Sequence, residues 1–348
     1  MTWKAWVLSL TVWVSACGGL WMGDEPETDP ESLFEEFWMA YDRHYAHFGI
    51  KDVDWDEIYA TYRPKVDAHT TDEQLFEVFA DMIAHLEDGH VYLVGNGNRA
   101  LSNRRLRARD DGFDGDAIRK ELLGDDKGRG GPQEVTYGRL EGNIGYLRIS
   151  TLAGGSGRGT DVSGWVRELD GLVDELSDTE AMIVDLRNNS GGRAFNAQYI
   201  AGLFAPEPRP FLLTRSRNGP GREDFSSPRE WVVKPTGGEP YTRPVVVLTN
   251  RRTFSAAEWL TLGLRQYDHV YHMGTHSGGG MAMFLPRELA NGWMFTISVQ
   301  DTRCIKGRSY ERLGVPPHRY LPKGNGGGRV DHALEGAMEF LNGDRDGD

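Results

Sequence analysis

The sequence predicts an α/β protein in which a small helical unit precedes a core sheet of mainly parallel strands. From residue 134 onward, short apolar runs with strand character alternate with amphipathic helical segments, which is the order of βαβ units. Between residues 34 and 86, aromatic and apolar residues instead recur every three or four positions, as in helices. Apolar residues make up 39% of the 348 residues, which is enough to build a core.

Composition excludes several classes of protein. The formal net charge of −13 argues against nucleic acid as a partner. The 44 glycines follow no three-residue repeat, so the chain is not collagen-like. Cys17 and Cys304 are the only two cysteines, and they can form neither a disulfide framework nor a four-thiolate zinc site.

Residues 1–16 have the pattern of a signal peptide. Lys4 precedes an apolar run over residues 5–14, which is too short to span a membrane. The run ends in Val-Ser-Ala-Cys, which resembles the bacterial lipobox, so we expect a lipid on Cys17 and a flexible tether over residues 17–31. An ordinary signal peptide cleaved after Ala16, or a buried apolar segment, remains an alternative.

A helical N-terminal domain is predicted over residues 32–95, and a solvated connector over residues 96–135. Asp54 caps the second of three expected helices, and Thr71 with Gln74 forms a capping box at the start of the third. The arginines of the connector are nearly cancelled by the aspartates that follow them. The connector is too short to hold a peptide-binding module such as PDZ.

The α/β core is predicted over residues 136–340, followed by a disordered tail over residues 341–348. Its expected elements are strands at 143–149, 181–186, 244–249, 270–273 and 294–299, and helices at 160–176, 196–204 and 255–266.

Two turns that follow buried strands carry candidate catalytic groups. Gly191 and Gly192 would let backbone N–H groups point into a cleft, as in an oxyanion hole. Ser255 would stand at a helix N-terminus, where the dipole and free N–H groups stabilise an alkoxide. Taken alone, the glycines are equally a plain βα turn, and Ser255 is equally an N-cap serine.

His90 and Glu311 are the candidate base and its supporting acid. His90 follows a glycine at the end of a predicted helix, where an imidazole can project into a shared cleft. Glu311 lies in a loop and could orient a base or position a water molecule. Taken alone, each is an ordinary surface or loop residue.

Together these segments resemble peptidase family S41, specifically its tricorn-like and C-terminal-processing-like members. The similar segments are HLEDGH (85–90), GYLRI (145–149), IVDLRNNSGG (183–192), VVVLTNRRTFSAAE (245–258), GTHSGG (274–279) and YERLGVPPH (310–318). Residues 34–55 also look like the N-terminal region of the tricorn-like branch. The resemblance covers most of residues 32–322 and implies a crotonase-like core of the ClpP/crotonase type.

The resemblance also implies a role for each candidate residue. Ser255 matches the nucleophile, His90 the tricorn-type base and Glu311 the acid that supports it. The oxyanion hole corresponds to the N–H groups of Ala256 and Gly192, with Gly191 as the alternative to Gly192. No metal or organic cofactor is implied.

This sequence departs from the family pattern at two positions. The processing branch uses a lysine base after the serine, but no lysine lies between Ser255 and Lys306, which leaves His90 as the base. Tricorn-type sites have a serine just before the histidine, where this chain has Gly89. Glu311 is therefore expected to act either directly or through water.

The predicted function is a lipid-anchored serine peptidase of the bacterial cell envelope that cleaves peptides or unfolded proteins. One alternative is a non-catalytic ligand- or peptide-binding protein on the same fold, since the family has retinoid-binding relatives. A second alternative is crotonase-type acyl chemistry on a thioester. Only the chemistry of the site can distinguish these functions.

Overall fold

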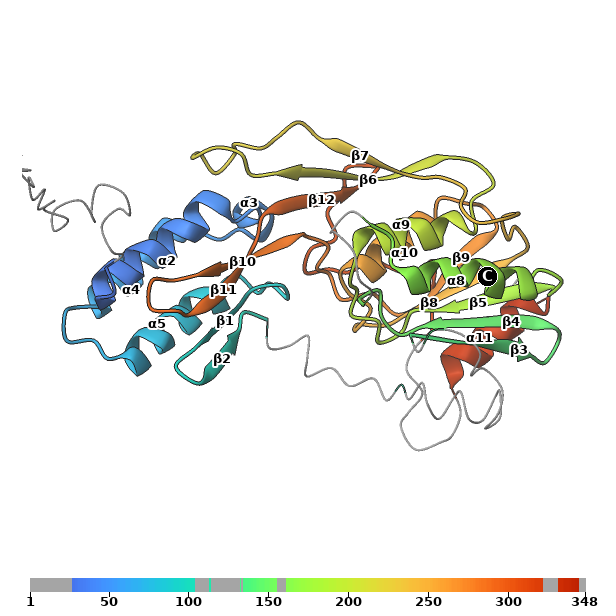
Figure 1. The fold of residues 1–348 in the computed structure, drawn as a ribbon, viewed down its shortest axis with the longest axis horizontal. Coiled ribbons are helices and arrows are strands. Elements are labelled where there is room, and N and C mark those ends of the chain that lie inside the picture. Colours follow the sequence, from blue (N-terminus) through green and yellow to red (C-terminus); the bar gives the residue numbers. More distant parts are fainter. Residues whose placement is uncertain are drawn as a thin grey trace, which may run out of the picture.

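Three sheets organise the chain (Figure 1). The computed structural model describes residues 27–103, 113, 132, 134–154, 161–321 and 331–343. Within these residues the sheets have six, four and three strands. The predicted α/β class, with a helical region at the N-terminal end, is confirmed.

The six-stranded sheet forms the centre of the core. Its strands, in spatial order, are β13 (Arg319–Tyr320), β9 (Val270–Gly274), β8 (Val245–Thr249), β5 (Ala181–Asp185), β4 (Ile144–Ile149) and β3 (Val135–Leu140). Neighbouring strands are parallel except for β3, which is antiparallel to β4. Every residue of β5 and β8 is buried, as expected for parallel strands covered on both faces.

Helices cover both faces of this sheet. Met182 and Val184 pack in one cluster with α8 (Gly164–Glu175), α9 (Ala194–Gly202) and α10 (Ala256–Leu264). Ile183, which points the other way, packs with α11 (His332–Leu341). The glycine turn follows the C-terminal end of β5, and the serine turn follows the C-terminal end of β8. Because these strands are parallel neighbours, the sheet brings the two turns together.

The N-terminal unit contains the predicted helices. They are α2 (Pro30–His44), α3 (Phe48–Lys51), α4 (Trp55–Tyr62), the 3-10 turn η1 (Arg63–Lys65) and α5 (Asp72–Ala84). The predicted cap at Asp54 is confirmed, because its side chain accepts hydrogen bonds from two backbone N–H groups of α4. The capping box of Thr71 and Gln74 is confirmed as well.

The N-terminal unit also contains a sheet, which corrects the expectation of a purely helical domain. Its strands, in spatial order, are β10 (Phe284–Glu288), β11 (Met294–Ser298), β1 (Tyr92–Gly95) and β2 (Asn98–Leu101). Residues 284–298 were expected in the core, and residues 98–101 in the connector. Instead, Trp293 and Phe295 of the β10–β11 hairpin pack against Phe76 of α5 and Phe37 of α2. The apolar helix faces need this cover, and it comes from a distant part of the chain.

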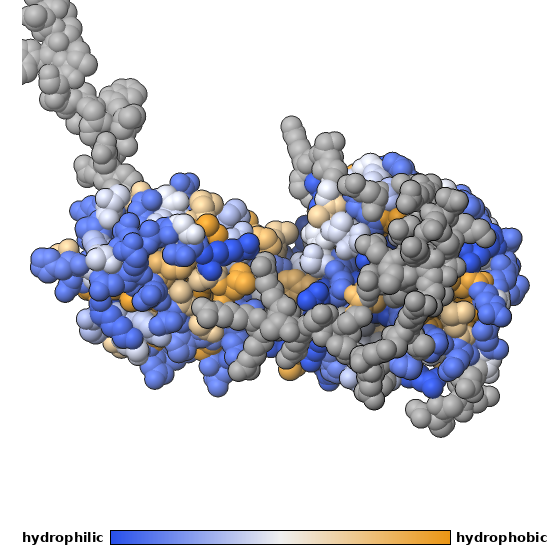
Figure 2. Space-filling model, turned by 90° about the horizontal axis from the view of Figure 1, so that it is seen from below, coloured by the Kyte–Doolittle hydropathy of each residue, from blue (hydrophilic) through white to orange (hydrophobic). Residues whose placement is uncertain are grey.

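A three-stranded ribbon joins the two units. It consists of β12 (Gln300–Cys304), β6 (Arg209–Ser216) and β7 (Arg229–Val233), and β12 follows β11 after a single residue. Seen from below, two lobes meet at a narrower waist, and apolar residues gather on the N-terminal lobe beside it (Figure 2). The candidate catalytic residues come from both units, His90 from the turn before β1 and Ser255 from the turn before α10.

Several sequence-based expectations fall outside the described residues. These are the signal peptide, Cys17 and most of its tether, most of the connector, and residues 344–348. Among the helices that are described, none combines the length and apolar character needed to cross a membrane.

Candidate active site

Ser255 and His90 meet between the two units. Ser255 comes from the turn between β8 and α10, and His90 from the turn between α5 and β1. The two residues are 165 positions apart in the sequence, yet Nε2 of His90 lies 3.0 Å from Oγ of Ser255. This distance falls within the range of about 2.6–3.2 Å required for proton transfer between a nucleophile and its base.

The backbone of Ser255 is held in an unusual conformation. Its φ is 59° and its ψ is −127°, a region that costs a residue with a side chain about 1–3 kcal/mol. Such a sharp turn from strand to helix exposes a serine hydroxyl at the end of a sheet. The strain implies that the surrounding groups constrain this turn.

Glu258 is the main constraint on the turn. One carboxylate oxygen accepts hydrogen bonds from the N–H groups of Ser255 at 3.1 Å and Gly280 at 2.9 Å. The other accepts from Oγ of Ser277 at 2.6 Å and the N–H of Gly279 at 2.9 Å. Burial raises the pKa of Glu258 to about 7, against the opposing effect of these hydrogen bonds. Sequence reasoning missed this residue, although its position three residues after Ser255 is a capping signal.

The glycine turn is fastened to the serine turn. Asn188 and Asn250 exchange hydrogen bonds of 2.9 and 2.8 Å, and the N–H of Phe254 donates to the carbonyl of Asn189 at 2.9 Å. A Cβ atom on Gly191 would lie 2.6 Å from Cβ of Ser255. The turns therefore touch only because position 191 has no side chain.

Two backbone N–H groups at this contact are available to a ligand. Within the described residues, the N–H groups of Gly192 and Ala256 donate to no acceptor. The N–H of Gly191 instead donates to Oδ1 of Asn189 at 2.8 Å. The alternative in which Gly191 is an oxyanion-hole donor is therefore wrong, because its backbone N–H already donates a hydrogen bond within the glycine turn.

The imidazole of His90 packs against two aromatic rings. The centroid of its ring is 4.7 Å from that of Phe254, which precedes Ser255, and 5.0 Å from that of Phe284 on β10. The backbone N–H of His90 donates to Oδ1 of Asp88 at 2.9 Å, and the Thr296 hydroxyl donates to the backbone carbonyl of His90 at 2.6 Å. Both the ring and the backbone are thus held in place.

Burial lowers the pKa of His90, although the nearby carboxylates of Asp88 and Glu311 partly oppose this effect. A lowered pKa keeps the imidazole neutral near pH 7, which is the form that accepts a proton. Nδ1 has no hydrogen-bond partner among the residues that the structure describes.

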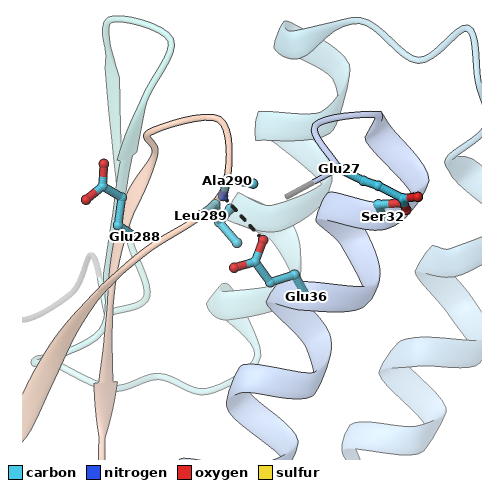
Figure 3. A pocket seen from close by; sticks show the side chains of 6 residues that line it. All are labelled: Glu27, Ser32, Glu36, Glu288, Leu289 and Ala290. Atoms are coloured by element: carbon cyan, nitrogen blue, oxygen red, sulfur yellow. Dashed lines mark hydrogen bonds between the residues drawn. The ribbon is translucent and has the colours of Figure 1, made fainter. Parts of the chain in front are cut away.

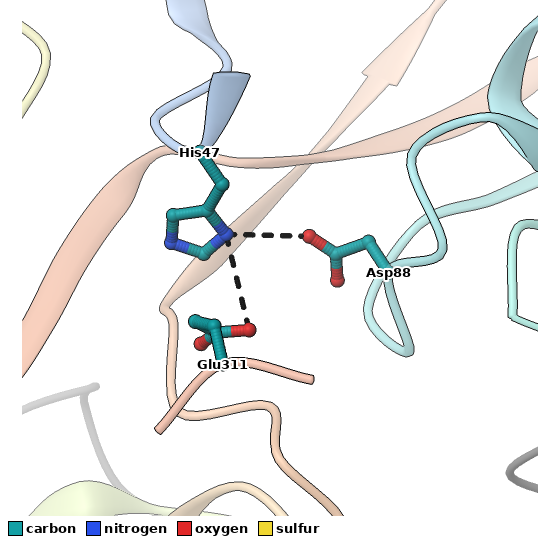
Figure 4. A group of neighbouring side chains, drawn as sticks. All are labelled: His47, Asp88 and Glu311. Carbon is teal, nitrogen blue, oxygen red and sulfur yellow. Dashed lines mark ion pairs between the residues drawn. The ribbon is translucent and has the colours of Figure 1, made fainter. Parts of the chain in front are cut away.

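Glu311 does not hydrogen-bond to His90 in the described part of the chain. Its Oε1 accepts from the N–H groups of Met281 at 2.7 Å and Ala282 at 3.1 Å. Its Oε2 points toward Nδ1 of His47, 3.9 Å away (Figure 4). The direct contact between Glu311 and His90, which the sequence allowed, is therefore not observed among the described residues. Glu311 faces His47 instead.

A buried charge cluster, formed by His47, Lys51, Asp88 and Glu311, lies behind His90. Oδ2 of Asp88 is 3.3 Å from Nζ of Lys51 and 3.4 Å from Nδ1 of His47, and it accepts a hydrogen bond of 2.9 Å from the Tyr45 hydroxyl. Although burial opposes ionisation, Lys51 and His47 lower the pKa of Asp88 well below its usual range. Burial alone would lower the pKa of His47, but the carboxylates of Glu311 and Asp88 outweigh this effect, so that the pKa of His47 is raised.

Three members of the charge cluster could in principle ligate a metal ion. The ligand atoms of His47, Asp88 and Glu311 all lie within 4.8 Å of one another (Figure 4). However, the ammonium group of Lys51 already stands against the Asp88 carboxylate and would repel a divalent cation. The cluster is better explained as an ion-pair network. Sequence reasoning missed it because Lys51 and His47 lie about 40 residues before Asp88 and match no short motif.

A hollow of about 500 Å³ lies between the start of α2 and the turn that follows β10 (Figure 3). Glu27, Glu36 and Glu288 give it an acidic lining, and its remaining lining residues are Ser32, Leu289 and Ala290. No histidine or lysine is among these lining residues, and the hydroxyl of Ser32 donates to the Glu27 carboxylate at 2.7 Å.

The sequence profile of peptidase family S41 matches residues 143–321, more than half of the chain. The chain belongs to peptidase family S41. A second profile, that of the tricorn protease C1 domain, matches residues 26–84. The resemblance expected from the motifs is confirmed, and membership of S41 supports a serine peptidase.

Individual relatives agree with this family. The carboxy-terminal processing protease CtpA of Bacillus subtilis strain 168 is 25% identical over 189 residues, which is 53% of this chain and 37% of CtpA. The chain thus spans little more than a third of that relative's length. A "putative peptidase" from Parabacteroides merdae is 27% identical, with a TM-score of 0.81 over 92% of this chain and 99% of that one. Mature CPAF, at 14% identity and a TM-score of 0.63 over 92% and 98% of the two chains, shares the fold.

Proposed function

We propose that this S41 protein is a lipid-anchored serine peptidase of the bacterial cell envelope, with Ser255 as its nucleophile and His90 as its base. The observation that carries the proposal is the 3.0 Å contact between Oγ of Ser255 and Nε2 of His90, beside two unused backbone N–H groups. In this proposal the core is crotonase-like, no PDZ module delivers the substrate, and Cys17 carries the lipid.

The reaction divides among groups that are already positioned. Ser255 attacks the scissile carbonyl while His90 takes its proton, and the N–H groups of Gly192 and Ala256 donate to the resulting oxyanion. His90 then gives the proton to the leaving amine, and water completes the cycle through the same base. No metal or organic cofactor takes part in these steps.

Asp88 and Glu311 are positioning residues in this proposal. Their negative charges lie behind the imidazole and favour its protonated form as the reaction proceeds. The ring is oriented by Phe254 and Phe284, so Glu311 has no need to touch it directly. Glu311 then acts on His90 either by electrostatic attraction over a distance or through a water molecule.

Active-site labelling and peptide cleavage test the proposal together. The full chain, its Ser255→Ala variant and a Ser227→Ala control are treated with a fluorophosphonate and then offered a peptide library. Ser227 is an exposed serine in the loop before β7, away from the candidate site. Labelling and cleavage should be lost only in Ser255→Ala. Specific peptide binding without labelling or turnover would instead identify a binding protein.

A further inference from the structure

A small pocket of about 160 Å³ opens beside His90 on the N-terminal unit. Its lining includes His90 itself, Tyr92 on β1, Arg99 and Leu101 on β2, and Phe284 on β10. The strand register places these strand residues on the face of the four-stranded sheet that points away from the helices, because Leu93 and Ala100, on the opposite face, are buried in the helical core. The pocket is thus a feature of the open sheet face.

Arg99 gives this mostly apolar pocket a positive charge. Its guanidinium group lies over the ring of Tyr92, 4.6 Å from the centroid, which orients its donors. Arg99 is exposed, and among the described residues no carboxylate lies within ion-pair distance of it. A pocket with apolar walls and one oriented cation suits a ligand that carries a carboxylate.

The pocket lies on the leaving-group side of the scissile bond. The oxyanion donors Gly192 and Ala256 belong to the core, whereas the pocket lies on the opposite unit, against the base. Since a serine-peptidase base hands its proton to the leaving amine, the leaving group must lie next to His90. The pocket has the volume of about five water molecules, which is room for one residue rather than for a folded segment.

Resting on the function proposed above, we propose that this pocket binds the residue immediately after the scissile bond and that Arg99 binds a carboxylate on that residue. The carboxylate comes from one of two sources. It is the α-carboxylate of a substrate that ends at that residue, or the side chain of an aspartate or glutamate within a longer substrate.

Two pairs of peptides distinguish these sources. The first pair has one residue after the cleaved bond, with a free or an amidated carboxyl end. The second pair is longer and amidated, with glutamate or glutamine after the cleaved bond. Values of kcat/KM are measured for the full chain, for Arg99→Gln and for Arg229→Gln, a control arginine that also stacks on an aromatic ring, Trp231, but lies in the ribbon.

We expect the full chain to prefer the carboxylate member of one pair by about tenfold, as a charge-assisted hydrogen bond allows. A preference in the first pair identifies a terminal carboxylate, and one in the second pair an acidic side chain. Arg99→Gln should bring the ratio close to one, Arg229→Gln should leave it unchanged, and high salt should reduce it. A ratio near one in both pairs, or an unchanged ratio in Arg99→Gln, would overturn the inference.

Binding measurements keep this test independent of turnover. The same peptides are titrated calorimetrically into Ser255→Ala, with and without Arg99→Gln. A carboxylate preference that depends on Arg99 supports the pocket even if the chain proves not to cleave peptides. Conversely, cleavage that depends on Ser255 but shows no carboxylate preference would refute the pocket alone.

Discussion

Replacing Asp88 with asparagine should destabilise the protein strongly, because it leaves Lys51 as a buried charge without its partner. The Lys51 side chain is 1% exposed, and its ammonium group lies 3.3 Å from Asp88. Breaking a buried ion pair by removing one member costs about 3–5 kcal/mol. Since domains are typically stable by about 5–15 kcal/mol, this is a large share of the total.

Urea unfolding followed by tryptophan fluorescence measures this loss. Lys51→Met should also destabilise the fold, and the double variant should lose less than the sum of the two single variants by at least about 1 kcal/mol. The matched control is Glu31→Gln, which breaks the half-exposed pair with Arg63 and should cost less than about 1 kcal/mol.

A coupled, buried pair of Asp88 and Lys51 requires a large and non-additive loss of stability in these variants. A loss below about 1 kcal/mol in Asp88→Asn would refute it, since that is the scale of an exposed pair. Strict additivity in the double variant would refute it as well, because the two charges would then not interact.

Three further predictions concern the site and its anchor. Glu258→Gln should lower the free energy of unfolding by about 1–3 kcal/mol and lower kcat, because both carboxylate oxygens accept hydrogen bonds and the amide nitrogen of glutamine would face donors. An unchanged urea unfolding curve would count against this. Since burial lowers the pKa of His90, kcat/KM should fall as the pH drops through that pKa, with a midpoint below 6.5; a pH profile with a higher midpoint would contradict the neutral base. Cys17→Ser should leave the protein unprocessed or release it from membranes, and normal processing and membrane fractionation would refute the anchor.

Local patterns were sufficient to predict the elements that form the core of the site. β5 and β8 lie within one residue of their expected bounds, because each is a short apolar run that ends at a turn. The two turns after these strands were paired only through the family resemblance, which joins Gly192 and Ala256 in one oxyanion hole. His90 was likewise placed opposite Ser255 only through that resemblance.

The remaining features depend on contacts between distant residues. Nothing in the alternation of residues 284–298 indicates that the β10–β11 hairpin covers α2 and α5 rather than the core. The same holds for His47, Lys51 and Asp88, whose charges balance only after the helices have packed. The orientation of Glu311 toward His47, rather than His90, is likewise a result of tertiary structure.

Single-turnover kinetics of Ser255→Ala, His90→Ala and the double variant test the central claim most directly. A nucleophile and base that act as one unit should each lower kcat by roughly 10⁴-fold or more, and the double variant should be little worse than either single variant. Circular dichroism should show an unchanged fold in all three. The claim would be contradicted if Ser255→Ala kept its turnover and lost only about 1 kcal/mol of stability, since Ser255 would then serve as a helix cap alone.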